Sequence, residues 1–215
     1  MKITFAALMA FSILASPATA HEVWVERDAT GPARIYLGEP VDPVPAAGDP
    51  EFAKLTAPRL IAAGAVKPVA LVRRANHIEA AVTGTGDVRL TDDNVFAPWE
   101  AEGGKWEGVV YYARAGRTET RSALDLEIVP TAAGANSFVV NWLGKPLPGA
   151  KVTVINADRW QQSVAANDQG RIDVPVTGTG RYLLSISHDV EGARTLGGKE
   201  VAKTYHISTL TFVAP

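Results

Sequence analysis

Short segments in which apolar and polar residues alternate recur along most of the chain. Glu22 to Glu26 alternates residue by residue. Because successive side chains of a strand point to opposite faces, this pattern predicts a half-buried strand. Further strands are predicted at 33–37, 69–74, 78–82, 88–90, 109–113, 124–129, 137–142, 150–154, 171–176, 182–188 and 204–213. Many short strands separated by glycine-rich turns indicate an all-β fold.

Proline and glycine mark the segments expected to be irregular. Prolines at 40, 43, 45, 50 and 58 make 38–58 a long exposed loop, serving either as a solvated connection or as a docking surface. Only 51–63 could hold a short helical turn, and 189–203 is expected to be a loop. Trp99 and Trp106 bracket a Gly-Gly turn, so we expect them to pin a hairpin to the sheet rather than to form a sugar-stacking platform.

The first twenty residues have the three parts of a secretory signal. Lys2 precedes an apolar run from Ile3 to Leu14, and Ala18-Thr19-Ala20 is a cleavage site of the Ala-x-Ala type. The alternative, an uncleaved membrane anchor, is disfavoured because the run is shorter than the ~20 residues that span a bilayer. We therefore expect a periplasmic protein, not membrane-spanning after cleavage, whose mature chain begins at His21.

A change in composition at 130–136 suggests a domain boundary. The predicted organisation is a signal peptide at 1–20, a β-sandwich domain at 21–130 and a second at 131–215. In the second, a Gly-Lys-Pro-Leu-Pro-Gly-Ala turn at 144–150 is followed by Asp168-Gln169-Gly170 and Gly180-Arg181-Tyr182. These motifs resemble transthyretin-like and immunoglobulin-type sandwiches, which implies that fold and no single function.

Charge and sulfur content exclude several classes of function. The formal net charge is −2 and basic residues are not clustered, so nucleic acid is not an expected partner. There is no cysteine, and both methionines lie in the first nine residues. The mature chain thus has no sulfur ligand for Cu(I), zinc ribbons or iron–sulfur clusters.

The four histidines are the candidate metal ligands. A histidine at the mature N-terminus, as predicted for His21, offers an α-amine and an imidazole on one residue. His188 and His206 share parity with apolar neighbours and lie at the ends of two strands expected to pair, which makes them cross-strand neighbours. His77 is the fourth candidate, although a surface or turn role suits it equally. A site of His21, His188 and His206 suits Cu(II) and Ni(II) first, then Co(II) and Zn(II).

Several motifs together resemble a bacterial family. The Ala-x-Ala signal, the mature start His21-Glu22-Val23-Trp24, the stretches 33–39 and 111–117, and Tyr205-His206 followed by Thr209 to Phe212 are similar to those of NikM-like periplasmic proteins. The resemblance implies an accessory role in nickel and cobalt uptake, with the N-terminal histidine among the ligands. In the nickel-transport proteins themselves, the metal-binding histidine is the third residue of the mature chain. Here the third residue is Val23 and the histidine is first, which favours copper.

The sequence thus predicts a non-enzymatic periplasmic metal-binding protein that acts as an accessory, carrier or buffer in metal uptake. Its candidate partners are the metal ion and a membrane or outer-membrane metal transporter. Two alternatives stay open. One is a copper-dependent oxidase-type enzyme that uses the same site, and the other is a metal-free envelope or adhesion module. Gly-x-Ser-x-Gly and His-Glu-x-x-His motifs do not occur in the sequence.

Overall fold

A computed structural model describes residues 21–28, 30–62 and 69–215. The predicted signal peptide, residues 1–20, lies outside this part of the chain. In the described residues the fold is all-β: regular structure consists of strands and two short 3-10 turns, Phe52–Lys54 and Glu102–Gly104, with no α-helix. Accordingly, none of these residues forms a helix long and apolar enough to cross a membrane.

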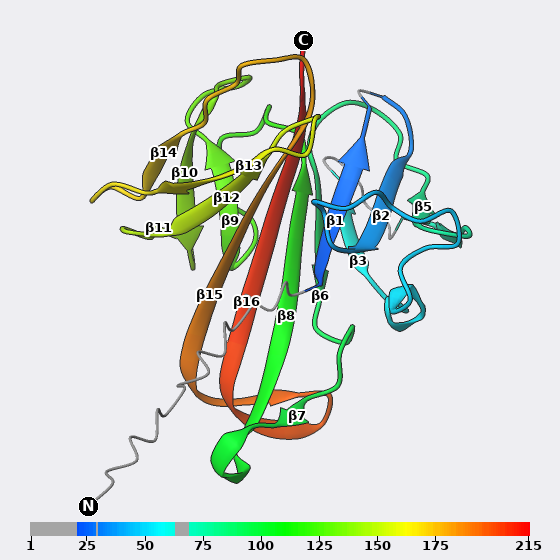
Figure 1. Cartoon of the computed structure of the whole chain (residues 1–215), viewed down its shortest axis with the longest axis vertical. Coiled ribbons are helices and arrows are strands. Elements are labelled where there is room, and N and C mark those ends of the chain that lie inside the picture. Colours follow the sequence, from blue (N-terminus) through cyan, green and yellow to red (C-terminus); the bar gives the residue numbers. More distant parts are fainter. Residues whose placement is uncertain (1–20, 29, 63–68) are drawn as a thin grey trace, which may run out of the picture.

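Within residues 21–28, 30–62 and 69–215, sixteen strands form three sheets (Figure 1). The first sheet has the order β1-β2-β5-β4, with bounds Glu22–Arg27, Ala33–Gly38, Ile78–Ala80 and Leu71–Arg73. The largest has the order β13-β12-β15-β16-β8-β6-β3, with bounds Gln161–Ala165, Lys151–Ile155, Gly180–Leu196, Lys199–Ala214, Trp106–Ala115, Val88–Asp92 and Arg59–Ala62; β7, Trp99–Glu100, pairs with β8. The third has the order β11-β10-β14, with bounds Lys145–Pro146, Ser137–Trp142 and Arg171–Asp173; β9, Leu126–Pro130, pairs with β10.

The large sheet lies between the two smaller ones, because its strands bury side chains on both faces. On β8, Val110 and Tyr112 belong to one apolar cluster, which includes β10 and β12 residues such as Phe138 and Val152. Val109, Tyr111 and Ala113 belong to another, built with β1 and β2. Alternate residues of one strand point to opposite faces, so the two clusters lie on opposite sides of the large sheet.

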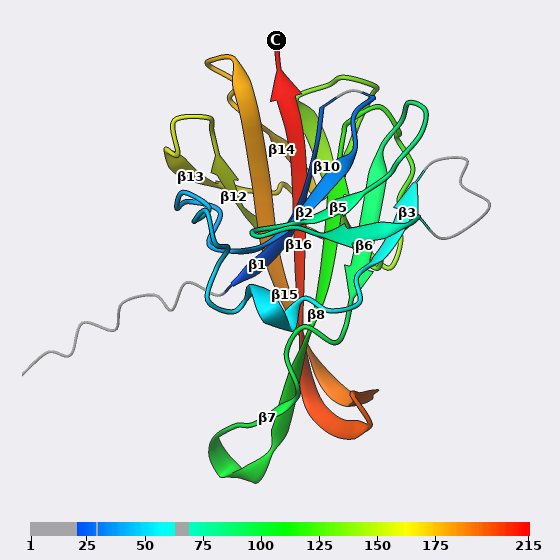
Figure 2. The ribbon, with the colours of Figure 1, turned by 90° about the vertical axis from the view of Figure 1, so that its right-hand side faces the viewer.

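A parallel pair, β8 with β16, joins the two segments predicted as separate domains. Its register runs from Lys203 opposite Glu107 to Thr211 opposite Ala115. The predicted boundary at residue 130 falls at the end of β9, yet strands from both sides of it share this one sheet. Figure 2 shows β7 and the adjoining ends of the long strands projecting beyond the rest of the molecule.

One local prediction is wrong. The segment 189–203 is not a loop, because β15 and β16 continue as a paired hairpin up to Leu196 and from Lys199. The turn is confined to Gly197 and Gly198, whose positive φ angles of 53° and 77° suit glycine. The short helical turn expected within 51–63 is present at Phe52–Lys54, and Arg59–Ala62 is a strand.

Strand β1 is an edge strand, and hydroxyl groups of β16 cover its free edge. Thr209 Oγ1 donates to the Val23 carbonyl at 2.8 Å, and Thr211 Oγ1 donates to the Val25 carbonyl. Both threonines are buried. The hydroxyls satisfy backbone acceptors that have no partner strand, and they fix the position of β1 on the large sheet.

Replacing Thr209 by valine is expected to lower the free energy of unfolding by about 1–2 kcal/mol, because the buried Val23 carbonyl loses its donor. Urea unfolding measures this difference. Thr209→Ser keeps the hydroxyl and should retain most of the stability. Equal losses in both variants would assign the effect to packing of the threonine methyl group instead.

Candidate functional site

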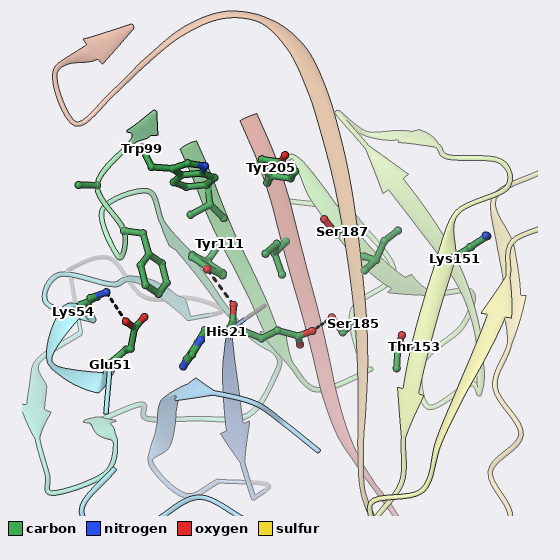
Figure 3. A pocket seen from close by; sticks show the side chains of 16 residues that line it. His21, Glu51, Lys54, Trp99, Tyr111, Lys151, Thr153, Ser185, Ser187 and Tyr205 are labelled. Atoms are coloured by element: carbon green, nitrogen blue, oxygen red, sulfur yellow. Dashed lines mark hydrogen bonds and ion pairs between the residues drawn. The ribbon is translucent and has the colours of Figure 1, made fainter. Parts of the chain in front are cut away.

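The candidate site surrounds His21, at the start of β1, where an open cavity of about 990 Å³ lies against the large sheet (Figure 3). Strands β8, β15 and β16 provide its floor, β12 one side, and the segments around Glu51 and Phe96 the other. Its lining residues are His21, Glu22, Glu51, Lys54, Phe96, Ala97, Trp99, Val109, Tyr111, Lys151, Thr153, Ser185, Ile186, Ser187, Tyr205 and Ile207. The volume is in the range of small-molecule sites.

His21 is held from two sides. Tyr111, on β8, donates its hydroxyl to the His21 carbonyl oxygen at 3.1 Å. The His21 Nε2 atom lies 3.1 Å from Asp49 Oδ1, and Oδ1 also accepts the Glu51 backbone N–H at 2.7 Å. The side chain of His21 is 27% exposed and that of Asp49 15% exposed. The imidazole therefore has one nitrogen engaged by a carboxylate while part of the ring remains open to solvent.

A smaller cavity of about 310 Å³ lies on the other side of His21. His21 lines both cavities, so its ring separates them. The charged residues of the smaller cavity are Glu39, Asp42 and Asp49, all from or next to the proline-rich loop. These carboxylates give the His21 ring an acidic surrounding.

Glu22 carries the most unusual carboxyl group of the site. Its Oε1 accepts a hydrogen bond from Ser185 Oγ at 2.7 Å, while Oε2 is buried with no hydrogen-bond partner among the described residues. Burial raises the pKa of Glu22 to about 7, and the Ser185 hydrogen bond opposes this shift. Burial likewise raises the pKa of Tyr111 above its usual range, so its hydroxyl stays protonated as a donor.

Aromatic rings form the outer wall of the large cavity. Trp99 stacks on Tyr205 with ring centroids 5.9 Å apart and planes inclined by 20°. Phe96 lies between the His21 and Tyr111 rings, with centroid distances of 6.3 Å and 6.2 Å. The expected hairpin of Trp99 and Trp106 is confirmed, since Glu100 pairs with Trp106 in β7–β8. Trp99 is 37% exposed, and it lines the cavity.

The structure brings His188 and His206 together, as predicted, because they are direct partners in the β15–β16 register. Both rings meet Trp142 edge-on, with centroid distances of 4.9 Å and 4.5 Å. His206 Nδ1 lies 3.0 Å from the Tyr112 hydroxyl. Desolvation lowers the pKa of His206 to about 4, and Arg194 adds to this shift. His206 is thus a neutral core residue near neutral pH.

His21 is not brought to this pair. It contacts Phe96 and packs with Tyr111, on the face of β8 and β16 that points to the first sheet. His206 contacts Tyr112 and Trp142 on the opposite face. His77 is remote from both: its Nδ1 lies 2.8 Å from Asn76 Oδ1 and its ring packs on Tyr36. Across the described ranges, no group of three or more His, Cys, Asp or Glu side chains is arranged to hold a metal.

Sequence reasoning missed Asp49 and Tyr111 as partners of His21. Asp49 lies in the proline-rich loop, where no periodic pattern gives the direction of a side chain. Tyr111 belongs to a predicted strand, but its contact with His21 joins residues 90 positions apart. The identity of both partners follows only from how β1 packs on the large sheet.

Comparisons of the chain with protein-family models, with curated proteins and with solved structures found no match.

Proposed function

We propose that this chain is a periplasmic protein that binds a divalent transition metal, Cu(II) before Ni(II), Co(II) or Zn(II), through the α-amine and imidazole of His21 after cleavage at Ala20. Its role is that of a non-enzymatic accessory, carrier or buffer in metal uptake, with a membrane or outer-membrane metal transporter as its partner. One observation carries the proposal: the hydrogen bond between His21 Nε2 and Asp49.

That hydrogen bond selects a tautomer. An ionised carboxylate only accepts hydrogen bonds, so Nε2 must carry the proton, and the lone pair of the neutral imidazole is then on Nδ1. Nδ1 is the ring nitrogen nearer the backbone, so it can bind one metal ion together with the α-amine of the same residue. Histidines that ligate metals usually donate their other ring N–H to a carboxylate or carbonyl in this way.

The surroundings of His21 also favour a cation. Glu39, Asp42 and Asp49 line the smaller cavity together with His21. Nearby carboxylates lower the energy of a bound divalent ion and raise its local concentration. His77, His188 and His206 are not part of the proposed site, since His21 lies apart from them.

The same proposal includes the type of sandwich and the family. The two apolar clusters are proposed to be the cores of two immunoglobulin- or transthyretin-like β-sandwiches that share the large sheet. The chain is proposed to be NikM-like on the motifs given above, with copper preferred because His21 precedes Val23 instead of occupying the third position.

The decisive test changes only the N-terminus. The full coding sequence is expressed with its own leader, mass spectrometry verifies that the secreted chain starts at His21, and a portion of the protein is acetylated on its α-amine. Calorimetric titration with Cu(II), Ni(II), Co(II) and Zn(II) should show a loss of Cu(II) affinity of at least about 100-fold in the acetylated protein, because the blocked amine can no longer bind the metal. Equal affinities would overturn the proposal.

A second variant tests the carboxylate. Asp49→Asn should weaken Cu(II) binding by roughly tenfold, because the amide orients the imidazole but no longer supports its basicity. Asp42→Asn is the matched control, since Asp42 lines the same cavity without a hydrogen bond to His21. A similar loss in both variants would indicate a general effect of negative charge rather than orientation of the ring.

A further inference from the structure

The large cavity contains a polar end and an aromatic end that the proposed metal site does not use. Glu22 and Ser185 lie at the polar end, and Trp99, Tyr205 and Phe96 provide the aromatic wall. Figure 3 shows the Trp99 and Tyr205 side chains on one side of the opening and Ser185 on the other. A ligand that bridges the two ends would need an apolar body and a polar head group.

Glu22 determines the charge of that head group. Within the described residues its Oε2 atom is buried and has no hydrogen-bond partner, although each carboxylate oxygen can accept more than one hydrogen bond. In the same part of the chain no lysine or arginine forms an ion pair with Glu22; of the two lysines that line the cavity, Lys54 is paired with Glu51 at 2.7 Å and Lys151 is exposed on β12. A buried carboxylate without a counter-charge is costly, and a cationic donor removes that cost. An anionic group placed against Glu22 would be repelled.

The aromatic wall fits the same ligand class. Trp99 exposes more than a third of its surface although it stacks on Tyr205. Faces of tryptophan and tyrosine attract cations and also provide apolar contact area. Metal ions alone do not suit this part of the cavity, since a single carboxylate with serine and threonine hydroxyls is a poor donor set for a transition metal.

We propose that this cavity binds a small organic amine, with its protonated amino group hydrogen-bonded to Glu22 and its apolar body against the Trp99–Tyr205 pair. The contacts proposed for the amine are made by Glu22, Trp99 and Tyr205, whereas the metal is assigned to His21, which lines the same cavity. Different variants therefore test the two kinds of binding.

The test uses three probes with one aromatic body: 2-phenylethylamine, 2-phenylethanol and phenylacetate. Each is titrated into the metal-free secreted protein and followed by calorimetry and ligand-observed NMR. The amine should bind saturably, the alcohol more weakly and the carboxylate not at all. Absence of saturable amine binding, or phenylacetate binding as tightly as the amine, would overturn the proposal.

Two variants locate the amine. Glu22→Gln keeps the shape and an acceptor for Ser185 but removes the charge, and should weaken 2-phenylethylamine binding by roughly tenfold. Trp99→Ala should weaken it several-fold through loss of the wall. The controls are Glu200→Gln and Trp160→Ala, exposed residues outside the cavity that should leave affinity unchanged.

The outcomes separate the two proposals. Thermal unfolding shows whether Glu22→Gln folds. If it does not, the probe series on the unaltered protein and the Trp99→Ala variant still decide whether the cavity binds the amine. Unchanged amine affinity in a folded Glu22→Gln protein contradicts the assignment. The protein acetylated on the α-amine of His21 should lose Cu(II) affinity yet keep amine affinity, so either proposal can fail without the other.

Discussion

Replacing Glu127 by alanine is expected to lower the free energy of unfolding by about 3–5 kcal/mol. Glu127 is fully buried in β9, and its Oε1 accepts hydrogen bonds from Arg89 at 2.7 Å and Arg114 at 2.8 Å. Its Oε2 accepts the backbone N–H groups of Ala123 and Leu124. Removing the carboxylate leaves less negative charge around the two buried guanidinium groups. It also leaves two backbone amides without an acceptor. The change is measured by urea unfolding.

The neighbouring charges make the effect large. Asp87 also pairs with Arg114, and Glu119 also pairs with Arg89, so the alanine variant leaves each arginine a single carboxylate partner. Glu127→Gln keeps hydrogen-bonding capacity and should lose clearly less stability than the alanine variant. Glu200→Ala, at an exposed position, should stay within about 0.5 kcal/mol of the unaltered protein. A loss below about 1 kcal/mol in Glu127→Ala would show that the arginines find other partners.

The second large effect is a loss of stability in mild acid that depends on His206. Its folded-state pKa is about 4, below the usual histidine value of 6.5, because desolvation disfavours the charged ring. The unfolded chain therefore takes up a proton first as pH falls. The contribution of the neutral ring to stability is complete above about pH 6.5, decreases between pH 6.5 and 4, and does not change below pH 4. The decrease amounts to about 3 kcal/mol.

A variant isolates this contribution from that of the carboxylates. His206→Leu fills the position beside Trp142 without a titrating group. Urea unfolding of both proteins at several pH values between about 4 and 7 should show that the stability difference shifts in favour of the leucine variant as pH falls. Parallel pH profiles would mean that His206 is not desolvated in the folded protein.

Strand alternation allowed prediction of the all-β fold and of most strands, but not of how the sheets are joined. The pairing of His188 with His206 was predictable because both lie on consecutive antiparallel strands whose parity can be counted. The placement of His21 was not, since it depends on which face of the large sheet β1 covers. Local sequence carries no information on that face, because β8 and much of β16 bury consecutive residues and hence both of their faces.

The length of the β15–β16 hairpin was underestimated because its outer part has no apolar pattern. Residues 189–203 are rich in charged and small residues, and most are exposed, so they show no apolar period. Cross-strand pairing and the ion pair of Lys203 with Asp189 at 2.7 Å continue the hairpin, and within this segment only Leu196 and Val201 are buried in the apolar cluster. The Asp49 contact of His21 was equally hidden, because it comes from a loop whose path is fixed by tertiary packing.

The parallel pairing of β8 with β16 also determines when the chain can fold. It joins segments close to one hundred residues apart, since Lys203 lies opposite Glu107. Until residues 199–214 have been synthesised, the edge of β8 is unpaired and each apolar cluster lacks one of its central strands. Both clusters therefore close late, with the slow folding kinetics of a long-range topology.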